Sequence, residues 1–334
     1  MEQEAPVGVK AGGDSGSTFV SRFVPAIVPL LLLACLAALP LVGPGPNIIR
    51  LLFVTLTWVT ASVGWNLIGG FAGQISFGFA VFYGLGAYTT ALSLNGGIPP
   101  VMAFSFGAAV AAVASLLIGL PTFRLKGPYF AIATIGVSEA VRVVMMNVPF
   151  TGGASGYRII EKTRFVQSHH YYTALILAAL AVGISILLRR SKLGLALIAI
   201  REDQDAASDL GVNPFIAKLV VHALAAALAG AAGGVYARYS LFIDPDGVFA
   251  FRNGIAILLM PIIGGVGTIW GPVIGAFVYG LIHEEVVANF PQAHLLIFGS
   301  LLILIILFEP GGLVGLFRKF MRSLRARSSV GSHS

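Results

Sequence analysis

The sequence has few charged residues. Only 10% of its 334 residues are Asp, Glu, Lys or Arg, whereas 57% are hydrophobic. A soluble domain carries about 25% charged residues, so this chain falls short by about 50 of them. It cannot cover its surface with charge, which excludes a secreted, cytosolic or disordered protein. We therefore expect an all-α polytopic integral membrane protein, with about 20 residues in each crossing.

Cysteine and nucleotide-binding motifs are equally scarce. The single Cys35 excludes a disulfide framework and a cysteine-based zinc site, and the apolar run around it favours a core residue of the first span over a lipoprotein cleavage box. No Gly-x-x-x-x-Gly-Lys-Ser/Thr motif occurs, so we expect no ATP or other cofactor in this chain. His222 stands alone in an apolar run, which predicts a hydrogen-bonded core histidine. We expect no metal ligand and no catalytic residue.

Apolar runs separated by Gly- and Pro-rich turns predict about ten transmembrane helices: 22–42, 48–68, 74–94, 101–120, 128–148, 171–188, 215–241, 254–264, 272–290 and 293–308. The chain thus divides into a disordered tail (1–21), a transmembrane domain (22–309) and a basic tail (310–334). Whether 254–290 crosses once or twice stays open, as does a possible internal repeat between the glycine breaks at 69–73 and 264–267.

The basic residues indicate the orientation. With ten crossings and the N-terminus inside, thirteen Lys and Arg lie in cytoplasmic segments and four in outer loops. Cytoplasmic loops carry the excess of positive charge, so we expect both termini in the cytoplasm. The same rule accounts for the net charge of +7 without nucleic acid as a partner, and the basic tail is expected to meet anionic lipid headgroups.

The most polar internal stretch, 189–214, contains a short cytoplasmic segment of acidic and small residues. Its members that we single out are Glu202, Asp205, Ala206, Ala207 and Gly211. A short surface helix here would let another protein approach the two alanines closely, while the acids could meet basic residues of that partner. The alternative is a solvated linker whose charges only mark the water side.

Two groups of polar residues fall within the predicted spans. Asn66, Gln74 and Ser76 surround a glycine break, where they would line a translocation pathway or form hydrogen bonds between packed helices. Glu139 and Arg142 are three residues apart, hence on one helix face. They would lie near the pathway or neutralise each other as an ion pair near the outer end of the helix.

Several motifs resemble those of the branched-chain amino-acid permeases of ABC importers, in particular the LivM branch. They are Gly64-Trp65-Asn66-Leu67 through Gly73-Gln74-Ile75-Ser76-Phe77-Gly78, Lys126-Gly127-Pro128-Tyr129-Phe130, Thr151-Gly152-Gly153 with Gly156, and Gly264-Gly265-Val266-Gly267-Thr268. The stretch Asp205-Ala206-Ala207, followed by Gly211, is similar to the loop by which importer permeases dock their ATPase, with Asp in place of the usual Glu. The similarity covers about residues 48 to 317.

The resemblance implies the ABC importer permease fold and a transport subunit without its own ATPase site. Its partners would be a second homologous permease, two ATPase subunits and an extracytoplasmic binding protein, in the inner membrane of a prokaryote. Branched-chain amino acids would be the substrate, with urea or short amides as the alternative. A stand-alone ion-coupled transporter is the competing class, although Glu139 is the only clear acid within a span and has Arg142 beside it.

Overall fold

The computed structural model describes residues 32–125, 127–160, 165–289, 293–309 and 311–319. The expected disordered tail and most of the expected basic tail lie outside them. The chain falls into two compact units, one up to Pro44 and one from Gly45 onward.

In the first unit, residues Leu32–Val42 form a short apolar helix whose last turn is the 3-10 helix η1, Leu39–Val42. Cys35 is exposed on this helix, so the expectation of a core position is wrong. The large apolar side chains Leu32, Leu41 and Val42 are exposed as well, as suits a segment whose surroundings are not water.

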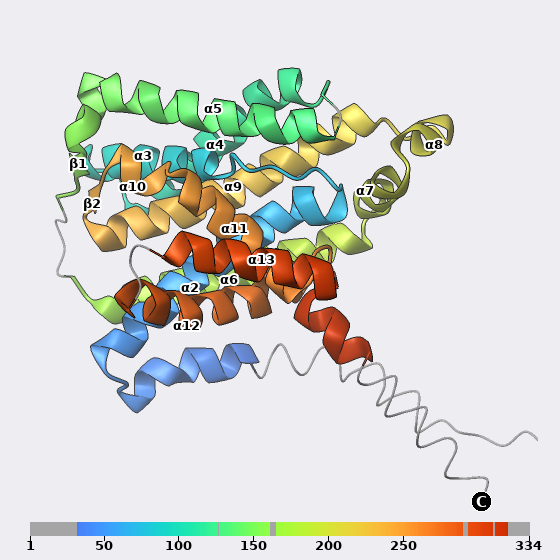
Figure 1. Ribbon diagram of the computed structural model, residues 1–334. Helices are drawn as coiled ribbons and strands as arrows, with labels where there is room; N and C mark the ends of the chain where they lie inside the picture. Colours follow the sequence, from blue (N-terminus) through green and yellow to red (C-terminus); the bar gives the residue numbers. More distant parts are fainter. Residues whose placement is uncertain (1–31, 126, 161–164, 290–292, 310, 320–334) are drawn as a thin grey trace, which may run out of the picture. The chain divides into compact units, whose positions relative to one another are not determined.

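The described part of the second unit is almost entirely helical, with one short antiparallel pair of strands (Figure 1). Its elements are α2 (Pro46–Asn66), the π-helix η2 (Leu67–Phe71), α3 (Ala80–Asn95), α4 (Pro100–Thr122), α5 (Pro128–Asn147), η3 (Pro149–Thr151), η4 (Gly153–Ser155), β1 (Tyr157–Arg158), α6 (Gln167–Arg190), α7 (Lys192–Glu202), α8 (Gln204–Asp209), α9 (Pro214–Ser240), β2 (Phe242–Ile243), α10 (Pro245–Val248), α11 (Phe251–Gly264), α12 (Gly271–Asn289) and α13 (His294–Phe308).

Six helical stretches among the described residues are long and apolar enough to cross a membrane, by length and composition: Pro46–Phe71, Pro100–Thr122, Pro128–Asn147, Gln167–Arg190, Pro214–Ser240 and Pro245–Gly264. Leu32–Val42 and Gly271–His283 are shorter apolar helices. The chain is therefore an all-helical protein with several candidate spans, and ten crossings with cytoplasmic termini stay a prediction.

The third expected span differs from the structure at its start. The sequence predicts a helix from Gln74, whereas α3 begins at Ala80. The intervening backbone is held by other partners: Trp65 Nε1 donates to the carbonyl of Ser76 over 2.7 Å, and the amide of Phe77 donates to Thr134 Oγ1 over 3.2 Å. These side chains satisfy two backbone groups of the stretch that a helix would otherwise have to pair.

The centre of the second unit is formed by α2 and α9, which pack against each other, and α9 also packs against α3 and α4. Small residues allow this close approach. A methyl group on Gly230 of α9 would lie 2.9 Å from the carbonyl oxygen of Gly107 in α4, and one on Gly64 of α2 would lie 2.8 Å from that of Ala225 in α9. Helices in lipid associate mainly through such contacts between small residues.

This packing predicts opposite effects for two glycine substitutions. Gly230→Ala should destabilise the fold by about 1–3 kcal/mol, since the methyl group meets the backbone of α4. Gly183→Ala in α6 should be neutral or stabilising by about 0.5–1 kcal/mol, because no described atom of another element lies within 4 Å of the added methyl. Thermal unfolding in detergent would measure both, and equal shifts would contradict the packing account.

Candidate functional site

The acidic segment predicted to dock a partner forms a helix of its own. Three capped starts divide the region into α7, α8 and α9. Ser191 accepts a hydrogen bond from the amide of Gly194, and Asn213 accepts one from Ile216. Asp203 accepts from the amides of Asp205 and Ala206 over 2.9 and 3.0 Å. Side chains that accept from the first helical amides are the usual start of a helix, so the chain turns sharply at each cap.

The helix α8 presents most of its residues to the outside. Glu202, Asp205 and Ala206 are exposed, whereas Ala207 is buried. Gly211, also exposed, ends the segment with φ +85°, a left-handed conformation that glycine adopts without strain. Ala206 can therefore meet a partner, while Ala207 packs inward and Gly211 shapes the turn.

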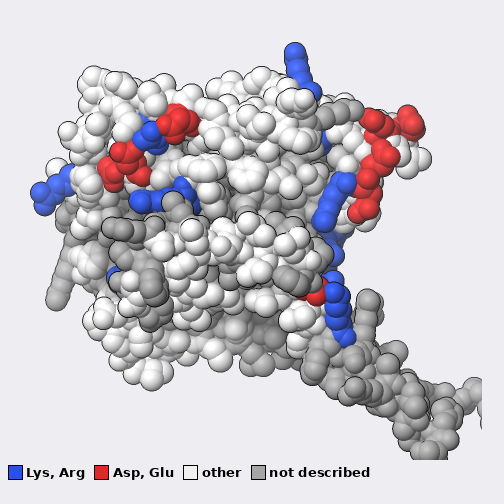
Figure 2. Space-filling view, in the orientation of Figure 1, with Lys and Arg blue, Asp and Glu red and all other residues white. Residues whose placement is uncertain are grey.

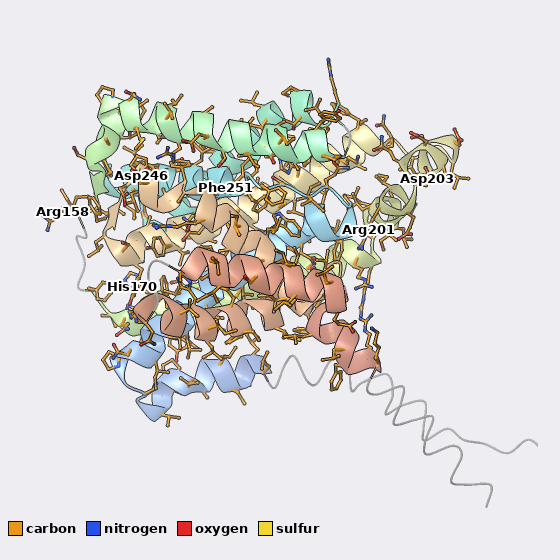
Figure 3. The ribbon with its side chains drawn as sticks, in the orientation of Figure 1. Arg158, His170, Arg201, Asp203, Asp246 and Phe251 are labelled. Atoms are coloured by element: carbon orange, nitrogen blue, oxygen red, sulfur yellow. The ribbon has the colours of Figure 1, made fainter. Side chains whose placement is uncertain are left out.

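Charge gathers in two places on the face shown in Figure 2. One group of red and blue atoms lies at the edge where Figure 1 draws α7 and α8, and another lies on the opposite side, where Figure 1 draws α10. Arg201 and Asp203 are labelled in Figure 3 at the edge formed by α7 and α8. Leu210 at the end of α8 is 84% exposed, an apolar side chain beside the acids that the sequence analysis did not single out.

A buried lysine attaches α8 to the long helix behind it. Lys218 of α9 is only 4% exposed, and its Nζ donates to Oε1 of Gln204 over 2.5 Å. A buried ammonium group needs polar partners, so this contact fixes where α8 lies. The sequence does not indicate this contact, because Lys218 resembles any charged residue near the end of a predicted span.

The two glycine-rich breaks, far apart in the sequence, lie against each other. Asn66 is completely buried; its Oδ1 accepts from the amide of Gly267 and its Nδ2 donates to the carbonyl of Thr268, both over 2.9 Å. A methyl group on Gly70 would lie 2.7 Å from the amide nitrogen of Gly267. Both ends of the Asn66 amide thus bond the backbone between α11 and α12 and hold the two breaks together.

Gln74 and Ser76 lie in two other environments. Gln74 lines a cavity of about 270 Å³ together with Gly73, Arg201, Gln204 and Asp205, among other residues. This cavity places a residue predicted for the translocation pathway next to α8, the helix predicted to dock a partner. Ser76 instead is buried, so the structure does not bring the three polar residues of the break to one lining.

Ser76 shares a cavity of about 10 Å³ with Thr134 and His222, close to the smallest space that holds one water. The ring of His222 packs edge-on against Phe82 and Phe123. Its Nδ1 has no hydrogen-bond partner in the described part of the chain, which differs from the predicted hydrogen-bonded histidine. These aromatic contacts come from α3 and from the residue that follows α4, and they could not be read from the sequence.

The ion pair predicted within α5 has a third member. Arg142 pairs with Glu139 on its own helix and with Asp246 of α10. Asp244 caps α10 by accepting from the amide of Gly247 over 2.9 Å, which sets the position of Asp246. Figure 3 labels Asp246 between α5 and α10. Sequence spacing could find the pair on one helix but not the acid that a distant helix supplies.

The position of this charged cluster along α5 determines the free energy of placing it in a membrane. Glu139 is the twelfth of the 20 residues of α5, so it lies about 2 Å from the middle of the helix at 1.5 Å per residue. The side chain of Glu139 is 52% exposed and that of Asp246 is 60% exposed. Charged groups facing lipid at that depth cost several kcal/mol, so this face requires cover by protein or water.

The buried Asn66 makes a testable contribution to stability. Asn66→Ala should destabilise the fold by about 2–4 kcal/mol, because the Gly267 amide and the Thr268 carbonyl lose their partners in a buried site. Asn95 is the matched control, since it also bonds one carbonyl and one amide, of Arg158 and Ile160, but at the end of α3, where both hydrogen bonds are exposed. Asn95→Ala should cost about 1 kcal/mol or less.

Thermal or denaturant unfolding in detergent would compare the two alanine variants. A cost for Asn66→Ala no larger than for Asn95→Ala would show that the two breaks do not depend on this amide.

The apolar helices, the breaks held by side chains and the charges confined to a few places define a multi-pass helical membrane protein. Among the described residues, no three His, Cys, Asp or Glu side chains are grouped so that they could hold a metal ion. Residues 47–306 match the family described as "Branched-chain amino acid transport system / permease component". The chain belongs to this family of permeases, which confirms the resemblance drawn from its motifs.

Individual relatives carry related names. The chain is 30% identical over 297 residues to the high-affinity branched-chain amino acid transport system permease protein LivM of Salmonella typhimurium and to that of Escherichia coli, covering 79% of this chain and 69% of each relative. It is 26% identical to the permease protein LivH of Escherichia coli over 287 residues, 78% of this chain and 91% of the relative. No solved structure matches the chain.

Proposed function

We propose that this chain is a permease subunit of an ATP-driven ABC importer that moves branched-chain amino acids (Leu, Ile and Val) across the inner membrane of a prokaryote. Membership of the permease family supports the transport role, and the names of LivM and LivH support the substrate class. The chain crosses the membrane about ten times with both termini in the cytoplasm. Its transmembrane domain extends over 22–309, between the tail 1–21 and the basic tail 310–334.

The observation that carries the proposal is the exposed helix α8. Two ATPase subunits bind the cytoplasmic face of the complex, one of them on the surface formed by Glu202, Asp205 and Ala206 of this chain. The small side chain of Ala206 permits close approach, and the acids meet basic residues of the ATPase. Ala207 packs inward and Gly211 forms the turn, so these two residues position the segment. No phosphate-binding loop lies in this chain, so ATP is bound by those subunits.

The face of α5 that carries Glu139 and Arg142 is an argument for a second permease subunit in the complex. A half-exposed carboxylate near the middle of a 20-residue span needs cover, and a homologous permease with a water-filled pathway between the two subunits supplies it. A zwitterionic amino acid delivered by an extracytoplasmic binding protein passes charges of both signs there. Gln74 lies beside the cytoplasmic cavity at the other end of this route.

Docking on α8 is tested by a steric series at one position. Ala206→Trp should reduce co-purification of the ATPases and ATP-driven uptake at least about tenfold, because overpacking a closely fitted contact costs about 1–3 kcal/mol. Ala206→Ser, which adds one oxygen, should retain both. Membrane insertion should be the same in the two variants, since Ala206 is exposed. Normal ATPase binding by Ala206→Trp would refute docking at this helix.

The charged cluster is tested by comparing its cation with one of its acids. Arg142→Gln leaves Glu139 and Asp246 without the cation that both pair with, whereas Asp246→Asn keeps the pair within α5. We expect Arg142→Gln to lower uptake about tenfold, equivalent to about 1.4 kcal/mol, and Asp246→Asn to lower it much less. Uptake by vesicles holding the whole complex would be measured, and equal losses would argue against this assignment.

Two uptake experiments distinguish the proposed function from an ion-coupled transporter and from an importer of urea or short amides. Uptake by the purified chain alone in liposomes, without ATPases, would establish an ion-coupled transporter and overturn the proposal. Competition by unlabelled urea or a short amide, but not by leucine, isoleucine or valine, would assign the importer to the other substrate class.

A further inference from the structure

Arg201 joins the docking helix to both glycine breaks. It lies in the last turn of α7, two residues before Asp203 begins α8. Its Nη1 donates to the carbonyl of Gly70 in the π-helix η2 over 2.6 Å. The stem of its side chain packs on Gly73, where an added methyl would lie 3.1 Å from Arg201 Cγ.

The same guanidinium group lies against the second break. A methyl group added to Gly267 would collide with Nη1 of Arg201, and Gly267 has φ +74°, which only glycine adopts readily. The backbone around Gly267 is in turn tied to the first break through Asn66. Arg201 therefore contacts both glycine breaks, which are also joined to each other by the Asn66 hydrogen bond.

The surface of α8 that faces the first break borders a cavity. The cavity of about 270 Å³ lies there, lined by Gln204 and Asp205 of α8 on one side and by Gly73 and Gln74 on the other. Arg201 borders the same cavity and so connects its two sides. Figure 3 labels Arg201 and Asp203 at this end of the molecule.

Both breaks have the properties of hinges. A π-helical turn stores an extra residue in a helix and is common at functional sites. Glycines with positive φ at 73, 265 and 267 can absorb large changes of backbone angle. A displacement of α7 and α8 would pull on the Gly70 carbonyl and push on Gly267 through one planar guanidinium group.

We propose that Arg201 is the coupling residue of this permease: through its contacts with Gly70 and Gly267 it transmits the movement of the ATPase-docking helix to the two glycine breaks. This inference rests on the proposed docking at α8. Arg201 is a positioning residue that touches neither the substrate nor ATP. Its loss disconnects ATP hydrolysis from transport while the ATPases stay bound.

The test compares three variants in the whole complex, reconstituted in liposomes with its ATPases and binding protein. The number of amino acids imported per ATP hydrolysed should fall about tenfold in Arg201→Ala, within the usual range for coupling between sites. Arg201→Lys keeps one donor for Gly70 but cannot lie flat against Gly267, so it should be intermediate. Lys192→Ala, an exposed charge on the same helix, should match the wild type.

Hydrogen exchange provides a readout that a merely structural role would not move. In the wild type, trapping the ATP-bound state should change exchange at α8 and at residues 66–73 and 264–271. In Arg201→Ala, the change should persist at α8 and vanish at both breaks. If Arg201→Ala does not accumulate in the membrane, Arg201→Lys and Arg201→Gln decide the question by the same two measurements.

Two results would overturn the proposal. Wild-type stoichiometry in Arg201→Ala would show that coupling takes another route. Loss of the ATPases from Arg201→Ala would make Arg201 a docking residue and leave docking at α8 intact. Docking itself fails only if Ala206→Trp still binds the ATPases, so the two proposals are distinguished.

Discussion

The structure depends on how backbone polar groups are satisfied where helices break inside an apolar protein. Water is absent from the bilayer core, so a carbonyl or amide outside a helix needs a partner from the protein. Here the partners are specific side chains: Trp65 for Ser76, Asn66 for Gly267 and Thr268, and Arg201 for Gly70. These bonds fix two interruptions in the helical core and join each to a neighbouring element.

Small residues supply the rest of the packing. Helix α9 lies against α2, α3 and α4 because glycine or alanine stands at each close approach. The family motifs gain a physical meaning from this arrangement. Gly64 meets the backbone of Ala225, Gly127 begins α5 with φ +58°, and Gly78 meets the backbone of Thr134. Gly64 and Gly78 of the motifs are thus needed for close contact with another backbone, and Gly127 is needed for its backbone conformation.

Much of the helix layout could be predicted from the sequence. Helices of apolar residues between Gly and Pro turns lie within a few residues of the predicted 48–68, 101–120 and 128–148. The start of α3 could not be predicted, because the backbone from Gln74 to Phe79 is held by side chains of α2 and α5. Within the candidate site, the acidic helix was found, while Arg201, Lys218 and Asp246 were missed because their partners are far away in the sequence.

The sequence by itself determined the membrane class, the permease family and the polar segment that meets water, because composition and local motifs carry those properties. Only the tertiary structure decided that the breaks at 67–73 and 264–271 touch, and that Arg142 pairs with an acid of α10. It also decided that Arg201 lies across both breaks. Such contacts join residues far apart in the sequence, and no local pattern of apolar or charged residues encodes which distant backbone groups will meet.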